Sequence, residues 1–307
     1  MGLLRRPVIL LLASTLLAAA CAGPHREART RSGVEDLLPG DFLAPGRGRI
    51  DPGAVAAAAR EARYVLVGES HDNACDHRAQ AAVLAALVDA GRPPAVGLEQ
   101  VDVERQEALD RFSSGHLALG ALPAALDWKA RWGVDFDRYR PIFAVADDRR
   151  LPLVALNLPA SLVRTFGEQG ESGLSSESRA LLPPEIFPPP PEQEARLREA
   201  FEAHRHGDHG GGAGPGGEDP VARFSRVQSL WDTAMAGRAV DAASRLGRPV
   251  AILAGAGHVE HGWGIESRLA RLDPGGHVLS VLPWRGDGEL DPAAADLFFF
   301  CPEAEDG

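Results

Sequence analysis

The sequence predicts an α/β fold in which a mostly parallel sheet is flanked by helices, with a helical and loop lid inserted. Short apolar runs of strand-like composition alternate with longer stretches of helical periodicity, and this alternation is typical of parallel strands joined by helices. The 307 residues, 45% of them hydrophobic, are enough to bury one large core. We therefore expect a single domain over residues 50–301, with the lid at about 158–220.

Five runs have the length and composition of strands: Arg63 to Gly68, Ala95 to Leu98, Leu153 to Leu156, Val250 to Ala254 and Val278 to Leu282. Helical patterns cover seven stretches: Pro52 to Glu61, Asp76 to Ala90, Val103 to Phe112, Arg138 to Arg149, Pro191 to His204, Pro220 to Leu246 and Gly264 to Leu272. The prolines at 188–191 and the glycines at 210–212 indicate an excursion from the sheet. Phe298–Phe300 predicts a final edge strand or packing over the core, and an exposed triplet would indicate a dimer surface.

The N-terminus has the three regions of a secretory signal. Arg5 and Arg6 precede an apolar run from Val8 to Leu17, and the small residues Ala18–Ala20 follow it. A membrane-spanning helix needs about 20 apolar residues, so this run is too short to be one. The sequence therefore predicts a signal peptide over residues 1–20.

Cys21 follows these small residues directly, and the junction resembles a bacterial lipobox, although Ala18 stands where that pattern prefers leucine. The resemblance implies that Cys21 is lipidated and becomes the mature N-terminus; the alternative is a plain cleaved signal with an incidental cysteine. Residues 21–49 are polar and predict a tether. We expect a protein bound to a membrane of the bacterial cell envelope through its lipid, with the folded domain outside the cytoplasm.

Charge and cysteine content restrict the partners. The formal net charge of -11 argues against nucleic acid, because binding phosphates requires a basic surface. Lipidation of Cys21 would leave Cys75 and Cys301, and the sequence alone does not pair two cysteines this far apart.

Polar side chains follow four predicted strands at their carboxyl ends. Glu69 and His71 follow the first, Glu99 the second, Asn157 the third and His258 the fourth. In open α/β sheets, ligands bind outside these ends, where the loops converge. Extended backbone would place Glu69 and His71, two residues apart, on the same face. The pattern predicts that Glu69, His71, Glu99 and His258 meet in one pocket.

Six stretches between about Tyr64 and Trp284 carry a family resemblance by their order and spacing: Gly68-Glu69-Ser70-His71-Asp72-Asn73, Gly97-Leu98-Glu99, Tyr139-Arg140-Pro141-Ile142, Leu156-Asn157-Leu158-Pro159, Gln228 to Ala236 and Gly255-Ala256-Gly257-His258. Together they resemble the ChaN-type haem-binding lipoproteins. The Glu-x-His, Gly-Leu-Glu and Gly-His elements are shared by a wider superfamily that includes Tiki-type metalloproteases and erythromycin-esterase-like hydrolases. The resemblance therefore implies two classes of function.

The first class is a haem-binding lipoprotein of iron acquisition, which can hold haem as a pair across a homodimer. Haem needs an axial ligand and an apolar slot. The resemblance implies a tyrosine ligand, but this chain has only Tyr64, which begins a core strand, and Tyr139, which begins a helix. Trp263 stands where the family has a tyrosine, and indole cannot ligate iron. His258, His261 and Tyr139 are therefore the candidate haem ligands.

The second class is a metal-dependent hydrolase, either a peptidase or an esterase. Glu69, His71, Glu99 and His258 would be its catalytic and metal-binding residues, because carboxylates and imidazoles together suit zinc or a similar divalent ion. Glu260 is a candidate base for activating water. The alternative is that these groups only hydrogen-bond one another and cap neighbouring helices.

Two further groups have both a plain and a functional interpretation. His204, His206 and His209 in the lid are either part of a solvated loop or a weak site for metal or haem. Met235 lies in the amphipathic stretch Gln228 to Ala236, which favours a core position over iron ligation.

Overall fold

A computed structural model of the protein describes residues 36–205 and 219–302, and within them eight strands form one sheet in the order β2-β1-β8-β7-β3-β6-β4-β5. β1 pairs antiparallel with β2 and β8, and the other neighbouring strands are parallel. The predicted α/β class with a mostly parallel sheet is confirmed. The strands are β1 (Phe42–Ala44), β2 (Gly48–Ile50), β3 (Tyr64–Glu69), β4 (Ala95–Asp102), β5 (Leu153–Asn157), β6 (Val250–Gly255), β7 (Val278–Trp284) and β8 (Leu297–Phe300).

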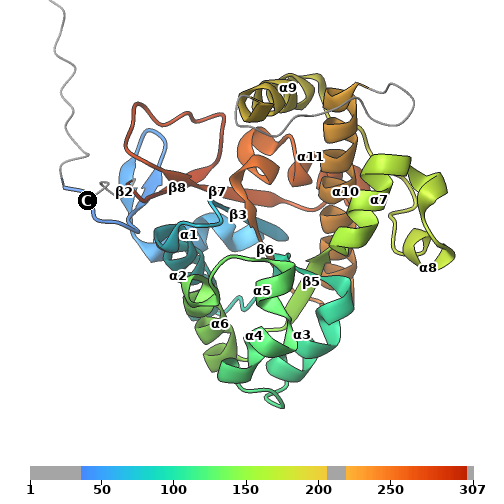
Figure 1. Ribbon diagram of the computed structural model, residues 1–307. Coiled ribbons are helices and arrows are strands. Elements are labelled where there is room, and N and C mark those ends of the chain that lie inside the picture. The colour runs from blue at the N-terminus through green and yellow to red at the C-terminus, as the bar shows by residue number, and fades with distance from the viewer. Residues whose placement is uncertain (1–35, 206–218, 303–307) are drawn as a thin grey trace, which may run out of the picture. The chain divides into compact units, whose positions relative to one another are not determined.

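Helices cover both faces of this sheet (Figure 1). They are α1 (Pro52–Ala58), α2 (Ala74–Asp89), α3 (Gln106–Ser113), α4 (Leu122–Ala125), α5 (Trp128–Arg131), α6 (Phe136–Arg149), α7 (Ala160–Gln169), α8 (Ser176–Arg179), α9 (Pro191–Arg205), α10 (Pro220–Leu246) and α11 (Ile265–Leu272). On one face, Val65 and Val67 of β3 join a hydrophobic core shared with α1, α2 and α6. On the other, α10 contacts β4, β5 and β6 and packs against α11. Coverage of both faces explains why the central strands are apolar at successive positions.

The two helices that matter most for the site begin at residues that favour helix starts. The side chain of Asn73 accepts hydrogen bonds from the backbone N–H groups of Cys75 and Asp76 and so caps α2. Asp219 caps α10 through the N–H of Val221, next to a proline in the first turn. The cap at Asn73 ends the polar loop after β3 and starts α2 directly beside it.

All five predicted strands are present, and the sheet begins earlier than expected. β1 and β2 lie in the stretch interpreted as a tether, so the ordered fold starts before Ile50. The ring of Phe42 in β1 packs edge-on against Phe299, with centroids 6.4 Å apart, which explains the pairing. Phe298–Phe300 belong to β8, which lies between β1 and β7, and they are buried. This agrees with the expected packing in the core and excludes an edge strand and an exposed dimer surface.

The sequence predicts an insertion at about 158–220. Residues 158–205 of it are described, and they contain α7, α8 and α9 but no strand. α9 and α7 both pack against α10. The signal peptide, Cys21, His206 and His209 lie outside the described residues, as does the side chain of His204.

Within residues 36–205 and 219–302, no helix has both the length and the apolar character needed to cross a membrane.

A disulfide joins Cys75 and Cys301, whose Cα atoms are 5.7 Å apart. The bond links the first turn of α2 to the residue after β8, across 226 positions of sequence. Arg285 reinforces the junction, because its guanidinium pairs with Asp76 at 2.7 Å and donates to the carbonyl oxygen of Cys301. The polar loop that precedes α2 is thus held to the C-terminal part of the sheet.

Candidate functional site

Three neighbouring strands, β3, β6 and β4, place their carboxyl ends side by side. Glu69 at the end of β3 pairs in register with Gly255 at the end of β6. The N–H of Gly255 donates to the Glu99 carboxylate from β4 at 2.6 Å. A Cβ atom at position 255 would lie 3.0 Å from Cε1 of His71 and 3.7 Å from Oε2 of Glu99, so glycine allows these side chains to approach the strand. Glu69, His71, Glu99 and His258 therefore lie around one point.

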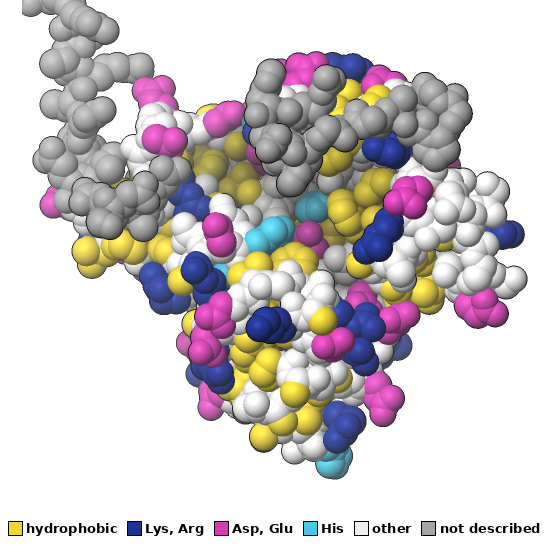
Figure 2. Space-filling view, viewed as in Figure 1, with side chains coloured by type: hydrophobic (Ala, Val, Ile, Leu, Met, Phe, Trp, Pro, Cys, Tyr) yellow, Lys and Arg dark blue, Asp and Glu magenta, His cyan; other side chains and the backbone are white. Residues whose placement is uncertain are grey.

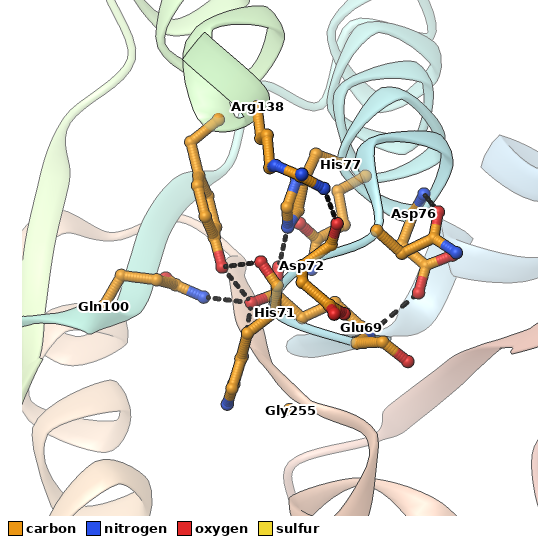
Figure 3. Close-up of polar contacts among 12 residues, drawn as sticks. Glu69, His71, Asp72, Asp76, His77, Gln100, Arg138 and Gly255 are labelled. Carbon is orange, nitrogen blue, oxygen red and sulfur yellow. Dashed lines mark hydrogen bonds and ion pairs between the residues drawn. The ribbon is translucent and has the colours of Figure 1, made fainter. Parts of the chain in front are cut away.

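The Glu69 carboxylate is the centre of a buried hydrogen-bond network (Figure 3). Its Oε1 accepts from His71 Nδ1 at 2.8 Å, from Gln100 Nε2 at 3.0 Å and from the Tyr139 hydroxyl at 2.6 Å. His77 Nε2 lies 3.1 Å from Oε2. Although burial opposes ionisation, His71 and His77 lower the pKa of Glu69 to about 2. Glu69 is therefore a fixed anion that orients its neighbours, and it is a weak base.

His71 is the open member of the site. Nδ1 bonds to Glu69, and 42% of the side chain remains exposed. Among the described residues, none hydrogen-bonds to Nε2. The ring meets Trp132 edge-on, with centroids 4.8 Å apart. Burial opposes protonation of this imidazole, but the hydrogen bond to Glu69 and the charge of Glu99 raise its pKa above the ordinary value.

His258 is enclosed. Its Nδ1 bonds to Asp232 Oδ1 at 2.6 Å, its Nε2 lies 3.5 Å from Glu99 Oε1, and only 12% of the side chain is exposed. Burial opposes its protonation, yet the two carboxylates raise the pKa of His258 well above its ordinary value. The pKa of Glu99 is lowered in turn, against the effect of burial, by the charge of His258. These three groups form a buried ion-paired cluster.

Asp232 extends this cluster into the lid. Its Oδ2 accepts a hydrogen bond from Gln193 of α9 at 2.9 Å and lies 3.8 Å from the Arg268 guanidinium of α11. Arg268 also donates to Gln193 Oε1 at 2.7 Å. Gln193, Asp232 and Arg268 are all at most 3% exposed. His258 is therefore fixed by groups from three helices packed over it.

The two tyrosines do not fit the role of an iron ligand. Tyr139 is 1% exposed, and its hydroxyl donates to Glu69 and accepts from Trp132 Nε1. Burial and the charge of Glu69 raise the pKa of Tyr139 far above its ordinary value, so the tyrosinate that would bind iron is disfavoured. Tyr64 is fully buried at the opposite end of β3, donates to Asp273, and has a pKa raised by burial to about 12. The expectation that Tyr139 reaches haem is therefore not supported by its position.

The remaining candidates lie at the margin of the site. Glu260 forms an ion pair with Arg196 of α9 at 3.4 Å, so its carboxylate already has a partner. His261, in the short η7 helix (Glu260–Gly262), stacks on Trp263 with centroids 4.2 Å apart. Met235 is fully buried, in agreement with its interpretation as a core residue.

A pocket of about 460 Å³, a size in the usual range for small-molecule sites, is lined by neighbours of the two histidines, although neither His71 nor His258 is part of its lining. Its lining includes Gln100, the bonding partner of Glu69, and two indoles from different elements, Trp132 and Trp231. Trp132 contacts the ring of His71, and Trp231 meets His258 edge-on at 6.4 Å. Figure 2 shows histidine side chains between hydrophobic ones in a hollow of this face.

The described carboxylates and histidines of the site do not form a zinc site. Within the described part of the chain, no three His, Cys, Asp or Glu side chains are placed to hold one metal ion. The oxygens of Glu69 and Glu99 instead face histidine nitrogens, the Gln100 amide, the Tyr139 hydroxyl and the backbone N–H of Gly255. The arrangement thus does not favour the metal-dependent hydrolase.

Three residues of the site are absent from the sequence-based prediction: His77, Trp132 and Asp232. His77 lies one turn into α2, four residues after the cap Asn73, and this spacing was a usable signal. Asp232 is an acid within a largely apolar helix, and a buried acid requires a partner. Trp132 follows the single turn of α5, and no periodicity in the sequence indicates its direction.

The fold and the site define an α/β protein with two carboxylate-histidine pairs at the carboxyl edge of its sheet, beside an indole-lined pocket. The chain belongs to the family described as haem-binding uptake, Tiki superfamily, ChaN, whose match spans residues 55–269.

Several solved structures resemble this chain. ChaN of Campylobacter jejuni, described with cofacial haem binding, has a TM-score of 0.64 at 18% identity and covers 84% of this chain and 95% of its own. The type III effector HopBA1 has a TM-score of 0.48 at 14% identity, with 82% and 94% covered. A mutant of the erythromycin esterase EreC in its open conformation has a TM-score of 0.44 at 15% identity, with 76% and 73% covered. Among curated proteins no match is found.

Proposed function

We propose that this protein binds haem at the pocket beside His71 and serves haem or iron uptake. The supporting observation is a half-exposed imidazole, anchored on a buried carboxylate, next to a pocket with two indole walls, in a chain of a haem-binding family. Haem requires such a pairing of an iron ligand with flat apolar surface. The imidazole and the two indoles therefore fit the group, and the pocket lining also contains Asp102, Glu104, Asp127 and Arg131.

A titration with ferric haem tests the proposal. When ferric haem is added to the protein, the Soret band of the haem should shift, and the shift should saturate because the protein has a defined number of sites. His277→Ala is the matched control, since it removes an exposed histidine at the opposite edge of the sheet, just before β7. A linear titration without saturation would refute haem binding.

The proposal includes membrane attachment through a lipid on Cys21, supported by the signal-like segment before it. A single acyl chain binds membranes only marginally, so several chains on this residue are expected. In a phase-partition assay, the Cys21→Ser variant should move from the detergent phase to the aqueous phase. If the variant stays in the detergent phase, lipidation of Cys21 is contradicted. Sedimentation with and without haem tests whether haem is held across a homodimer.

A further inference from the structure

The identity of the iron ligand is open in this chain, because its two tyrosines are both buried and hydrogen-bonded. Neither hydroxyl can reach a ligand in the pocket without breaking a bond to a carboxylate. Trp263 offers no alternative, since an indole N–H is only a donor. An axial ligand from the described residues must then be a histidine or a sulfur group, and Met235 and the disulfide-bonded cysteines are excluded by burial and by covalent pairing.

The described histidines of the site differ in whether a ring nitrogen is free to bind iron. His77 is fully buried beneath Tyr139. Both ring nitrogens of His258 face carboxylates. The ring of His261 stacks on Trp263, and no carboxylate among the described residues anchors either of its nitrogens. His71 alone among these four has one nitrogen anchored and the other without a described partner.

The anchoring of His71 has the form found at metal-binding histidines. Such a histidine donates its second ring N–H to a carboxylate or carbonyl, which fixes the tautomer and the ring direction and increases the basicity of the ligating nitrogen. Glu69 supplies this carboxylate, and Tyr139 and Gln100 hold it in place from two other elements. Gly255 lies beside the Cε1–Nε2 edge of the ring, where a Cβ would be 3.3 Å from Nε2, so the absence of a side chain at position 255 keeps space next to this nitrogen.

We infer that His71 Nε2, and not a tyrosinate, is the axial ligand to haem iron in this protein, with Glu69 as its positioning residue. This inference rests on the proposed haem binding. Trp132, whose indole borders both His71 and the pocket, would supply apolar surface for the haem. The ion pairs of His258 with Asp232 and Glu99 need not change.

The experiment compares ferric haem complexes of wild type, His71→Ala, His258→Ala, His261→Ala and the control His277→Ala by absorption and electron paramagnetic resonance. The Soret band of the His71→Ala complex should move to the position of weakly held haem. Its electron paramagnetic resonance spectrum should lose the signature of an axial nitrogen ligand. Added imidazole should restore both in His71→Ala. The His261→Ala and His277→Ala spectra should match the wild type.

The outcomes separate the inference from the function. If the wild type shows no saturable binding, the proposed function fails. If the wild type binds and His71→Ala gives the same spectra, the inference fails and haem binding stands. His71→Gln, whose amide can still donate to Glu69, serves as a second variant if His71→Ala does not fold. Unchanged wild-type spectra in His71→Gln would equally overturn the inference.

Discussion

The site contains two carboxylate-histidine pairs that are built alike and exposed differently. In each, a histidine near the end of a central strand bonds through Nδ1 to a buried carboxylate, at 2.8 Å for His71–Glu69 and 2.6 Å for His258–Asp232. The His71 side chain is 42% exposed, whereas that of His258 is 12% exposed and has Glu99 at its second nitrogen. One imidazole is open to a ligand, and the other is a component of a closed ion cluster.

The difference comes from what packs over each pair. His71 lies on the loop between β3 and α2, and its ring meets mainly Trp132 at the end of α5. His258 lies below α10, and α9 and α11 add Gln193 and Arg268 to the same network. The comparison teaches that the packing around a motif, and not its residue types, separates a binding group from a structural one.

Removal of Asp232 should have the largest effect on stability. Asp232→Ala leaves the buried Arg268 guanidinium and the His258 imidazole without their common anion, and breaking such a buried pair costs about 3–5 kcal/mol. Urea unfolding measures this loss. Asp147→Ala, which removes an exposed ion pair with Arg150, is the control and should cost less than about 1 kcal/mol. Equal effects of the two variants would show that the His258 cluster is not structural.

Loss of the disulfide should have the second-largest effect on stability. The bond lies next to the loop that carries His71. Replacing both Cys75 and Cys301 with Ala frees the start of α2 from the C-terminal strand, and loss of a long-range disulfide costs about 2–4 kcal/mol. Urea midpoints should fall accordingly. The haem spectrum should persist, because Arg285 still pairs with Asp76 beside the same loop. A lost Soret shift in this variant would show that the open pair depends on the covalent link.

The sequence predicts the fold well because its signals are local. Each of the five predicted strands is a contiguous apolar run, and the alternation with helices implies parallel pairing. β1 and β2 are missed because each has only three residues and is stabilised by non-local pairing with β8. The disulfide is missed for the same reason, since 226 positions separate its two cysteines.

The site is predictable in part. Glu69, His71, Glu99 and His258 follow strands that end at one edge, so their proximity follows from topology. The different exposure of His71 and His258 does not, because it depends on Trp132 and on Gln193 from segments outside the strands. Likewise, the helix-start position of Tyr139 gives no sign that its hydroxyl is committed to Glu69.

Removal of the charge on Glu69 should have the smallest of the three effects and should sharpen the comparison. Glu69→Gln can still accept the hydrogen bond from His71, so the ring stays in place while its anionic partner is lost. Substitution of a carboxylate behind a metal-binding histidine typically lowers metal affinity about 10- to 100-fold. Measured above the pH at which wild-type affinity stops rising, haem affinity should fall by that factor. Asp72→Asn, an exposed acid next to His71, is the charge-matched control and should retain wild-type affinity.

The pH dependence of haem affinity should also show the influence of Glu69 on His71. Iron and proton compete for His71 Nε2, so affinity decreases as the pH falls through the pKa of His71. The groups that face this imidazole are Glu69, Glu99 and His258; burial and His258 lower its pKa, while the two carboxylates raise it above the ordinary 6.5 overall. Wild-type haem affinity should therefore begin to fall above pH 6.5 on acidification. In Glu69→Gln one raising group is gone, so the fall moves to lower pH, which titrations between about pH 5 and 8 would detect. An identical pH profile in both proteins would show that Glu69 does not govern this imidazole.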